Sequence, residues 1–220
     1  MLEQEQIEIL EPFVTANKQQ LIKEVLARRT RYFTVVLEDI YKPHNASAVI
    51  RTCECLGVQD VHVIENVEEY HVNPYVVRGA SQWLNVQHYK ERGNNTVDCL
   101  QSLKKDGYQI VATSVGEDAV SLDDFQLTQK SAFVFGNEHS GVSKEVLDYA
   151  DIKLKVPMFG FTESYNLSVS AAIILNQARL QIEKSLINWH LSEPEMEELK
   201  LVWYKEIVKN SDIILRNALP

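Results

Sequence analysis

The sequence of 220 residues lacks any apolar run that approaches the roughly 18 to 20 residues needed to span a bilayer. Glu3, Glu5 and Glu8 stand at its start, where a signal peptide does not tolerate acidic residues. We therefore expect a cytoplasmic protein that does not bind a membrane. Hydrophobic residues make up 45% of the chain, which is enough for one sizeable core.

Cysteine is scarce, and its three copies, Cys53, Cys55 and Cys99, are an odd number. One residue separates Cys53 from Cys55, which is one fewer than in the CxxC spacing that metal and redox sites favour. We interpret all three as small buried apolar side chains, and we expect no metal site.

Basic residues are also few, because 22 Lys and Arg stand against 31 Asp and Glu, a formal net charge of -9. Affinity for nucleic acid normally comes from cations that displace the counterions of the phosphates. Any RNA site must therefore be a local patch. The best candidate is the cluster Arg28, Arg29 and Arg31, which is alternatively a solvated helix end whose cations favour the negative pole of the helix dipole.

Short runs of β-branched and aromatic residues begin at residue 33 and recur along the middle of the chain. They predict strands at 33–38, 61–65, 108–114, 131–136 and 152–157. Segments of helical length separate the strands, and the helices are expected to begin near Asn45, Thr96, Ser143 and Asn166. This alternation predicts an α/β domain over residues 31–188, with a mostly parallel sheet covered by helices on both faces.

Both ends of the chain predict helical extensions, at residues 1–30 and 189–220. Apolar residues recur at near-helical spacing among charges over residues 4–29. After Pro194 the pattern predicts one long amphipathic helix with an apolar face that must be buried, comprising Leu199, Val202, Trp203, Ile207 and Ile214.

Glycine-rich phosphate motifs are absent, since neither the Gly-Lys-Ser/Thr end of a phosphate loop nor a GxGxxG fingerprint occurs. The missing fingerprint weakens the interpretation that the alternation alone would favour, a nucleotide-binding oxidoreductase of doubly wound type. In an open parallel sheet, ligands bind beyond the carboxyl ends of the strands. The loops that follow the strands are therefore the places to search for a site.

The first such loop delivers Pro43 and His44 into a helix that is expected to open at Asn45. Asn45 is a good N-cap residue, and Arg51 follows it six residues later, close to the same helical face. Both residues are candidates for a site. The alternative makes Asn45 a cap only and Arg51 a surface cation.

Two further loops are unusual. In residues 135–146, Gly136 and Gly141 bracket a polar tetrad that includes Glu138, directly after an apolar strand, although a plain turn into a helix remains an alternative. In residues 156–178, five consecutive polar or aromatic residues at 162–166 precede a long apolar helix. They supply more polar groups than one helix cap requires, even if Ser164 and Asn166 are caps.

Taken together and in order, these loops resemble the three signature motifs of the SpoU/TrmH branch of the SPOUT methyltransferases. The motifs are carried by residues 45–53, 135–141 and 156–168, and the resemblance covers about residues 31–182. Residues 78–84, RGASQWL, resemble a segment of the tRNA-modifying TrmH subgroup. The sequence departs from the pattern at Tyr165, where leucine is usual, and at His139, where many relatives carry lysine.

The resemblance implies a deep trefoil knot in the C-terminal part of the sheet, a homodimer, and S-adenosylmethionine as the cofactor. It implies a cofactor pocket lined by Thr113, Gly136, Glu138, Val156, Tyr165 and Leu167. It implies a catalytic group made of Arg51, Asn45, Glu138, Ser164 and Asn166. Arg78, in the RGASQWL segment, joins the arginine cluster as a residue expected to contact RNA.

The reaction implied is 2′-O-methylation of a ribose in RNA, with a guanosine of the tRNA D-loop as the favoured target. An arginine stays protonated at neutral pH, so Arg51 suits stabilisation of the developing alkoxide better than proton abstraction. Ribosomal RNA is the alternative substrate within the family. A knotted RNA-binding protein without catalytic activity is the alternative from another class.

Overall fold

The computed structural model describes residues 2–91 and 93–218, which divide into two compact units. One unit is Arg31–Trp189, and the other combines the described residues before Arg31 with those after Trp189. The helices of the two chain ends thus pack with each other in one unit. The described residues contain no helix that is long and apolar enough to cross a bilayer.

The larger unit is built on a seven-stranded sheet in which every pair of neighbouring strands is parallel. The strand order is β3-β2-β1-β6-β4-β7-β5. The strands are β1 (Phe33–Glu38), β2 (Asp60–Ile64), β3 (Asn85–Tyr89), β4 (Gln109–Thr113), β5 (Val120–Ser121), β6 (Ser131–Phe135) and β7 (Ile152–Lys155). This confirms the predicted α/β class with a parallel sheet.

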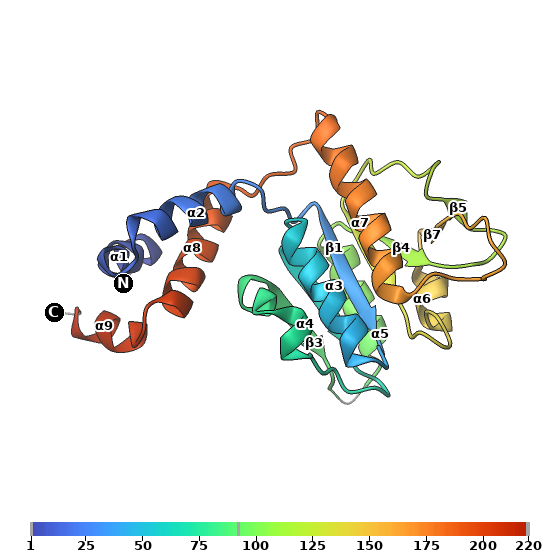
Figure 1. Ribbon diagram of the computed structural model, residues 1–220, viewed down its shortest axis with the longest axis horizontal. Helices are drawn as coiled ribbons and strands as arrows, with labels where there is room; N and C mark the ends of the chain where they lie inside the picture. Colours follow the sequence, from blue (N-terminus) through green and yellow to red (C-terminus); the bar gives the residue numbers. More distant parts are fainter. Residues whose placement is uncertain (1, 92, 219–220) are drawn as a thin grey trace. The chain divides into compact units, whose positions relative to one another are not determined.

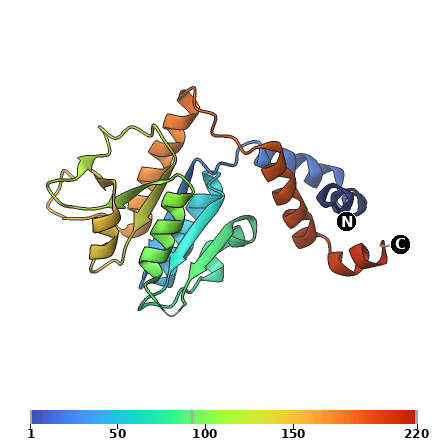
Figure 2. The same ribbon diagram turned by 180° about the vertical axis from the view of Figure 1, so that it is seen from behind.

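Helices cover both faces of the sheet, as Figures 1 and 2 show from opposite sides. On one face lie α3 (Pro43–Cys55), α4 (Pro74–Val77), the 3-10 turn η2 (Ala80–Trp83) and α7 (Leu167–Lys184); on the other lie α5 (Asn95–Lys105) and α6 (Lys144–Tyr149). Successive strand residues point to opposite faces, so Val35 and Leu37 join the α3–α7 core while Val36 joins the α5–α6 core.

The five predicted strands are all present, but β3 and β5 were missed. β3 is an edge strand whose residues, including Gln87 and His88, are half-buried or exposed, and its polar sequence therefore lacks the apolar run of a central strand. β5 has only two residues. The expectation that Asn45 caps its helix was wrong, because α3 begins two residues earlier with Pro43 in its first turn.

The helical unit differs from the two long helices that the sequence predicted. The N-terminal stretch breaks at Pro12 into α1 (Glu3–Leu10), the 3-10 turn η1 (Glu11–Phe13) and α2 (Ala16–Leu26). The C-terminal stretch breaks at Asn210, whose φ of 60° interrupts it, into α8 (Glu193–Ile207) and α9 (Ser211–Asn217). α1 packs against α8 and α9. Val202, assigned to the buried face, is 48% exposed.

The cysteine interpretation holds for Cys53 and Cys99, which are buried, and is wrong for Cys55, which is exposed at the end of α3. Burial raises the pKa of the Cys99 thiol to about 12. Within residues 2–91 and 93–218, no group of three or more His, Cys, Asp or Glu side chains is placed to hold a metal ion.

Candidate active site

Glu138 is the acceptor that joins two of the unusual loops. Its carboxylate accepts hydrogen bonds from the Asn45 side-chain amide at 2.6 Å and from the backbone N–H groups of Tyr41 and Lys42 at 3.1 and 3.3 Å. These donors lie just before and inside the first turn of α3, where backbone N–H groups lack partners within the helix. The half-buried carboxylate therefore fixes the start of α3 against the loop that follows β6.

Asn45 extends this contact to the third loop. Its side chain is 4% exposed, and its Oδ1 accepts a hydrogen bond of 3.2 Å from the Asn166 side-chain amide. Asn166 also caps α7, since its Oδ1 accepts from the Ser168 backbone N–H at 2.9 Å. Three of the five predicted catalytic residues thus form one continuous chain of hydrogen bonds, Asn166 to Asn45 to Glu138. Ser164 stands beside this chain, in the wall of the neighbouring cavity.

Two acidic residues at the end of β1 support these loops, and the sequence reasoning missed both. Glu38 is 2% exposed and accepts hydrogen bonds of 2.7 Å from the hydroxyls of Thr96 and Ser143, which begin α5 and α6. Asp39 accepts three backbone N–H groups from residues 66–68. Its own carbonyl accepts from the Asn137 side chain at 2.8 Å. The signal that the sequence offered was an acidic pair at the very end of an apolar strand.

Gly136 permits the tight turn after β6. A Cβ atom at this position would collide with backbone atoms of Gly141 and Val142, so only glycine fits without displacing the turn. The turn closes through a backbone hydrogen bond of 2.8 Å from the Gly141 N–H to the Asn137 carbonyl. Gly141 has a φ of 72°, the left-handed region that favours glycine. The geometry of this turn therefore explains why glycine stands at both position 136 and position 141.

A cavity of about 360 Å³ opens where the loops after β4, β6 and β7 converge. This volume lies within the range of roughly 300 to 1,000 Å³ that is typical of small-molecule sites. All six residues of the expected cofactor pocket line it: Thr113, Gly136, Glu138, Val156, Tyr165 and Leu167. The Thr113 hydroxyl donates to the Val134 carbonyl at 3.0 Å, which leaves mainly its backbone and methyl group to face a ligand.

Arg51 lies apart from this cavity. It is exposed on α3 and lines a second hollow of about 650 Å³, between α3, α4 and α7, with Ala48, Val76 and Ile173 among its neighbours. Arg51 forms no ion pair with any residue that the structure describes. Its guanidinium is therefore available to an external group.

The arginines expected to contact RNA differ in accessibility. Arg28 and Arg78 are exposed, and Arg78 has a φ of 46°, an uncommon conformation for a side chain of this size. Arg31 forms an ion pair of 3.0 Å with Asp60. Arg29 is 1% exposed and lies over the Trp203 ring, 5.4 Å from its centroid. Arg29 therefore stabilises the helical unit and is withdrawn from the RNA-contacting set.

A partly buried polar cluster lies at the other edge of the sheet, away from the cavity. Glu65 Oε1 pairs with His88 at 2.8 Å, and Glu65 Oε2 accepts from the Tyr70 backbone N–H at 2.8 Å. Although burial opposes it, these hydrogen bonds lower the pKa of Glu65 below its usual range. Burial raises the pKa of Tyr70 to about 12. The cluster fixes the segment between β2 and α4.

The fold and the site together define an α/β protein with a ligand pocket at the carboxyl ends of a parallel sheet, joined to an amide–carboxylate chain. Comparison of the sequence with known protein families identifies one family within that class. The profile of the SpoU rRNA Methylase family matches residues 32–176. The chain belongs to this family.

Relatives match over nearly the whole chain. A tRNA (guanosine(18)-2'-O)-methyltransferase of Borreliella burgdorferi is 45% identical over 208 residues, which is 94% of each chain. The enzyme of the same name from Aquifex aeolicus is 31% identical and covers 91% of this chain and 95% of its own. A crystal structure of the A. aeolicus TrmH/SpoU tRNA modifying enzyme superposes with a TM-score of 0.77 at 31% identity, covering 88% of this chain and 98% of that one.

Proposed function

We propose that this protein transfers a methyl group from S-adenosylmethionine to the ribose 2′-hydroxyl of a guanosine in the D-loop of tRNA, in the cytoplasm. The observation that carries the proposal is the hydrogen-bonded chain of Asn166, Asn45 and Glu138 at the edge of the cavity in which the expected cofactor residues meet. The names of the relatives from B. burgdorferi, A. aeolicus and Escherichia coli support the substrate.

The cavity has the properties that S-adenosylmethionine requires. The loops after β4, β6 and β7 line it, and Gly136 permits the tight turn after β6 that forms part of its wall, because a Cβ there would collide with the backbone of Gly141 and Val142. Val156 and Leu167 supply apolar walls, and Glu138 and Glu163 supply negative charge for a sulfonium ligand. The cofactor would supply a methyl group on positively charged sulfur, which is a good electrophile.

The remaining chemistry is assigned to this chain's own side chains. The hydrogen-bonded chain fixes the start of α3, and therefore the direction in which the helix presents Arg51. The guanidinium of Arg51 holds the 2′-oxygen and the adjacent phosphate at once, and it stabilises the alkoxide as the proton leaves to phosphate or water. Ser164 holds the ribose beside the cavity wall.

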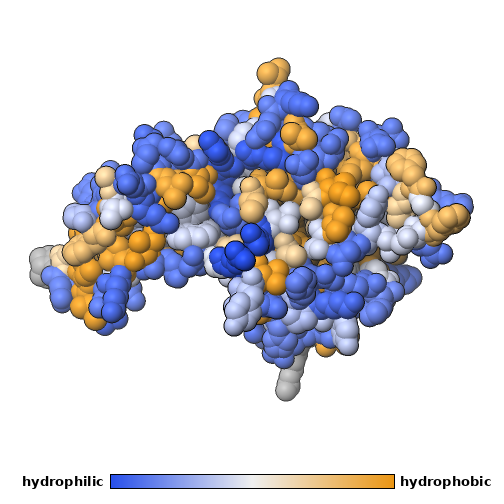
Figure 3. Space-filling view, viewed as in Figure 1, coloured by the Kyte–Doolittle hydropathy of each residue, from blue (hydrophilic) through white to orange (hydrophobic). Residues whose placement is uncertain are grey.

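A homodimer and a deep trefoil knot are part of the proposal. The hollow beside Arg51 is lined mainly by apolar residues of α3 and α7, and Val169 and Leu180 of α7 are 43% and 40% exposed. Figure 3 shows hydrophobic surface over α7. Exposed apolar surface of this kind suits contact with a second copy of the chain. The knot is supported by the convergence of the loops after β4, β6 and β7 on one cavity and by the resemblance of the motifs to the SpoU/TrmH branch.

RNA binding is assigned to local cations, because the net charge of -9 rules out attraction by the whole surface. Arg28 and Arg78 are the exposed members of the expected set, and Arg31 joins them if RNA phosphate replaces Asp60 as its partner.

Transfer of labelled methyl from S-adenosylmethionine to bulk tRNA and, separately, to ribosomal RNA tests the proposal. The expected product is 2′-O-methylguanosine in the tRNA D-loop. Arg51→Lys should lose most activity, because a point charge cannot hold two oxygens in a fixed geometry, and near-normal turnover of that variant would remove Arg51 from its role. Labelling of ribosomal RNA alone would show that the substrate is ribosomal RNA and not tRNA. Cofactor binding without transfer to either RNA would favour a non-catalytic RNA-binding protein.

A further inference from the structure

An exposed aromatic pair stands at the rim of the cavity and has no part in the chemistry assigned above. Tyr41 is 53% exposed, His139 is also exposed, and their rings meet edge to face with centroids 5.6 Å apart. The Tyr41 hydroxyl has no hydrogen-bond partner among residues 2–91 and 93–218. Among the described residues, the one ring contact of Tyr41 is therefore with His139, and the hydroxyl and much of the ring surface face outward.

The pair is held in place by its backbone. The Tyr41 N–H donates to Glu138 at 3.1 Å, and the His139 N–H donates to the Asn137 side chain at 2.9 Å. Asn137 in turn donates to the Asp39 carbonyl at 2.8 Å. Both rings consequently project from a fixed frame, so a ligand that stacks on them does not have to order the loops first.

The position of the pair links the cavity to the catalytic residues. His139 lines the cavity. The backbone N–H of Tyr41 donates a hydrogen bond to the carboxylate of Glu138, which also accepts from Asn45. Lys42, the next residue after Tyr41, is exposed beside it. A nucleotide with its ribose between the cavity and Asn45 would have its base close to these rings and a phosphate within reach of a cation.

We infer that Tyr41 and His139 form a stacking platform for the base of the nucleotide whose ribose is methylated. Aromatic side chains are the usual partners of unpaired RNA bases, and such stacking contributes about 5- to 100-fold in affinity per base. Stacking needs no positive charge, so it suits a protein of net charge -9. The inference rests on the proposed function, since it names what holds the substrate of that same site.

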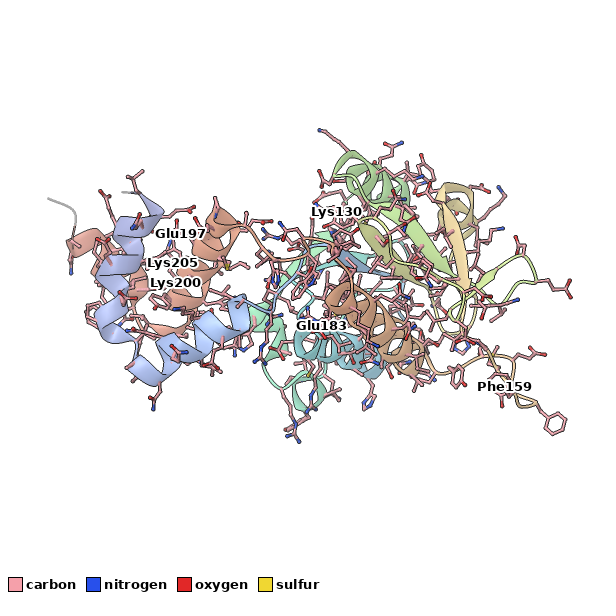
Figure 4. The ribbon with its side chains drawn as sticks, turned by 90° about the horizontal axis from the view of Figure 1, so that it is seen from above. Lys130, Phe159, Glu183, Glu197, Lys200 and Lys205 are labelled. Carbon is pink, nitrogen blue, oxygen red and sulfur yellow. The ribbon has the colours of Figure 1, made fainter. Side chains whose placement is uncertain are left out.

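Other exposed aromatic residues are less suited to this role. Phe159 and Phe161 are 95% and 110% exposed, but they lie on the loop after β7, with Glu163 nearby to repel phosphate. Figure 4 shows Phe159 projecting from the tip of that loop, away from the body of the domain. Neither residue is joined to the Asn45–Glu138 contact.

The test compares steady-state methyl transfer to tRNA by the wild type, Tyr41→Ala, Tyr41→Phe and His139→Ala. Tyr41→Ala should lower kcat/KM for tRNA by about 5- to 100-fold and leave the Kd for S-adenosylmethionine unchanged, while Tyr41→Phe stays within about twofold of the wild type. His139→Ala should give a smaller loss. Phe13→Ala is the matched control, because Phe13 is 58% exposed but lies in the helical unit.

A second readout reports stacking directly. A tRNA transcript with the fluorescent base 2-aminopurine at the position of methylation should be quenched by the wild type and by Tyr41→Phe, and much less by Tyr41→Ala. Equal quenching and equal kcat/KM for Tyr41→Ala and the wild type would overturn the platform. If the wild type transfers no methyl group to any RNA, the proposed function fails and the platform fails with it. If the wild type transfers methyl groups and Tyr41→Ala matches it in both measurements, the platform alone fails.

Discussion

Replacing Glu138 with Gln tests whether the hydrogen bonds of this carboxylate position the start of α3. The amide oxygen of Gln can take the place of Oε1, which accepts from Asn45 at 2.6 Å and from Lys42 at 3.3 Å. The amide NH₂ then faces the Tyr41 N–H, a donor opposite a donor. The substitution therefore removes one hydrogen bond. The two that remain are made to a neutral amide oxygen instead of a charged carboxylate.

The expected cost follows from these contacts. A hydrogen bond to a charged group contributes about 1.5 to 3 kcal/mol and a neutral one about 0.5 to 1.5 kcal/mol. Because the carboxylate is half-buried and water can replace part of the loss, we expect Glu138→Gln to lower the free energy of unfolding by about 1 to 2 kcal/mol. Displacement of Asn45 should lower kcat/KM for methyl transfer by about 10- to 100-fold.

Glu163→Gln is the matched control, since Glu163 lines the same cavity and makes no hydrogen bond to any other residue among 2–91 and 93–218. It changes the charge of the cavity equally. Urea unfolding and methyl transfer are measured for both variants. If the two substitutions change stability and kcat/KM by the same factors, charge alone accounts for the effect, and the positioning argument for Glu138 is refuted.

Three further predictions concern the cavity, the pH dependence and the thiols. Gly136→Ala should weaken S-adenosylmethionine binding more than tenfold in calorimetry, because its Cβ meets backbone, whereas Gly160→Ala, which meets nothing, should not. Burial lowers the pKa of His62 from its usual 6.5, so protonation favours the unfolded chain and stability falls as the pH drops below about 6.5. Urea unfolding at pH 8 and pH 5.5 should show less of this loss in His62→Gln, and an unchanged difference would contradict the assignment. At pH 8 a thiol reagent should reach buried Cys99, whose pKa is raised to about 12, only after unfolding; labelling of Cys99 in the native protein would contradict the fold there.

The central strands could be predicted from the sequence because burial on both faces demands continuous apolar runs. β1 is buried at every residue and β6 likewise, and both are plain in the sequence as FTVVLE and SAFVF. β3 has the same backbone geometry, but its residues are half-buried or exposed. Its NVQHY sequence therefore shows no continuous apolar run. The breaks near Pro12 and Asn210 have local signals that a single-helix interpretation overrode.

The candidate site was predicted as a set of residues but not as an arrangement. Asn45 has the chemistry of a helix cap, and only the partner 93 positions away, Glu138, shows that its side chain serves a contact between loops instead. The burial of Arg29 under Trp203 also depends on a partner far along the chain. Long-range pairs of this kind leave no mark in local spacing, whereas Gly136, with a purely local reason, could be singled out directly.

The predicted catalytic residues therefore fall into two physical groups. Asn45, Glu138 and Asn166 satisfy one another, so each is needed for the shape of the site before it is needed for any reaction. Arg51 is exposed and has no ionic partner among the described residues, so no such contact within the monomer accounts for its presence. A strong cation at that position is consistent with an anionic partner from outside the chain. The RNA phosphate beside the target ribose is the group that the proposed reaction brings there.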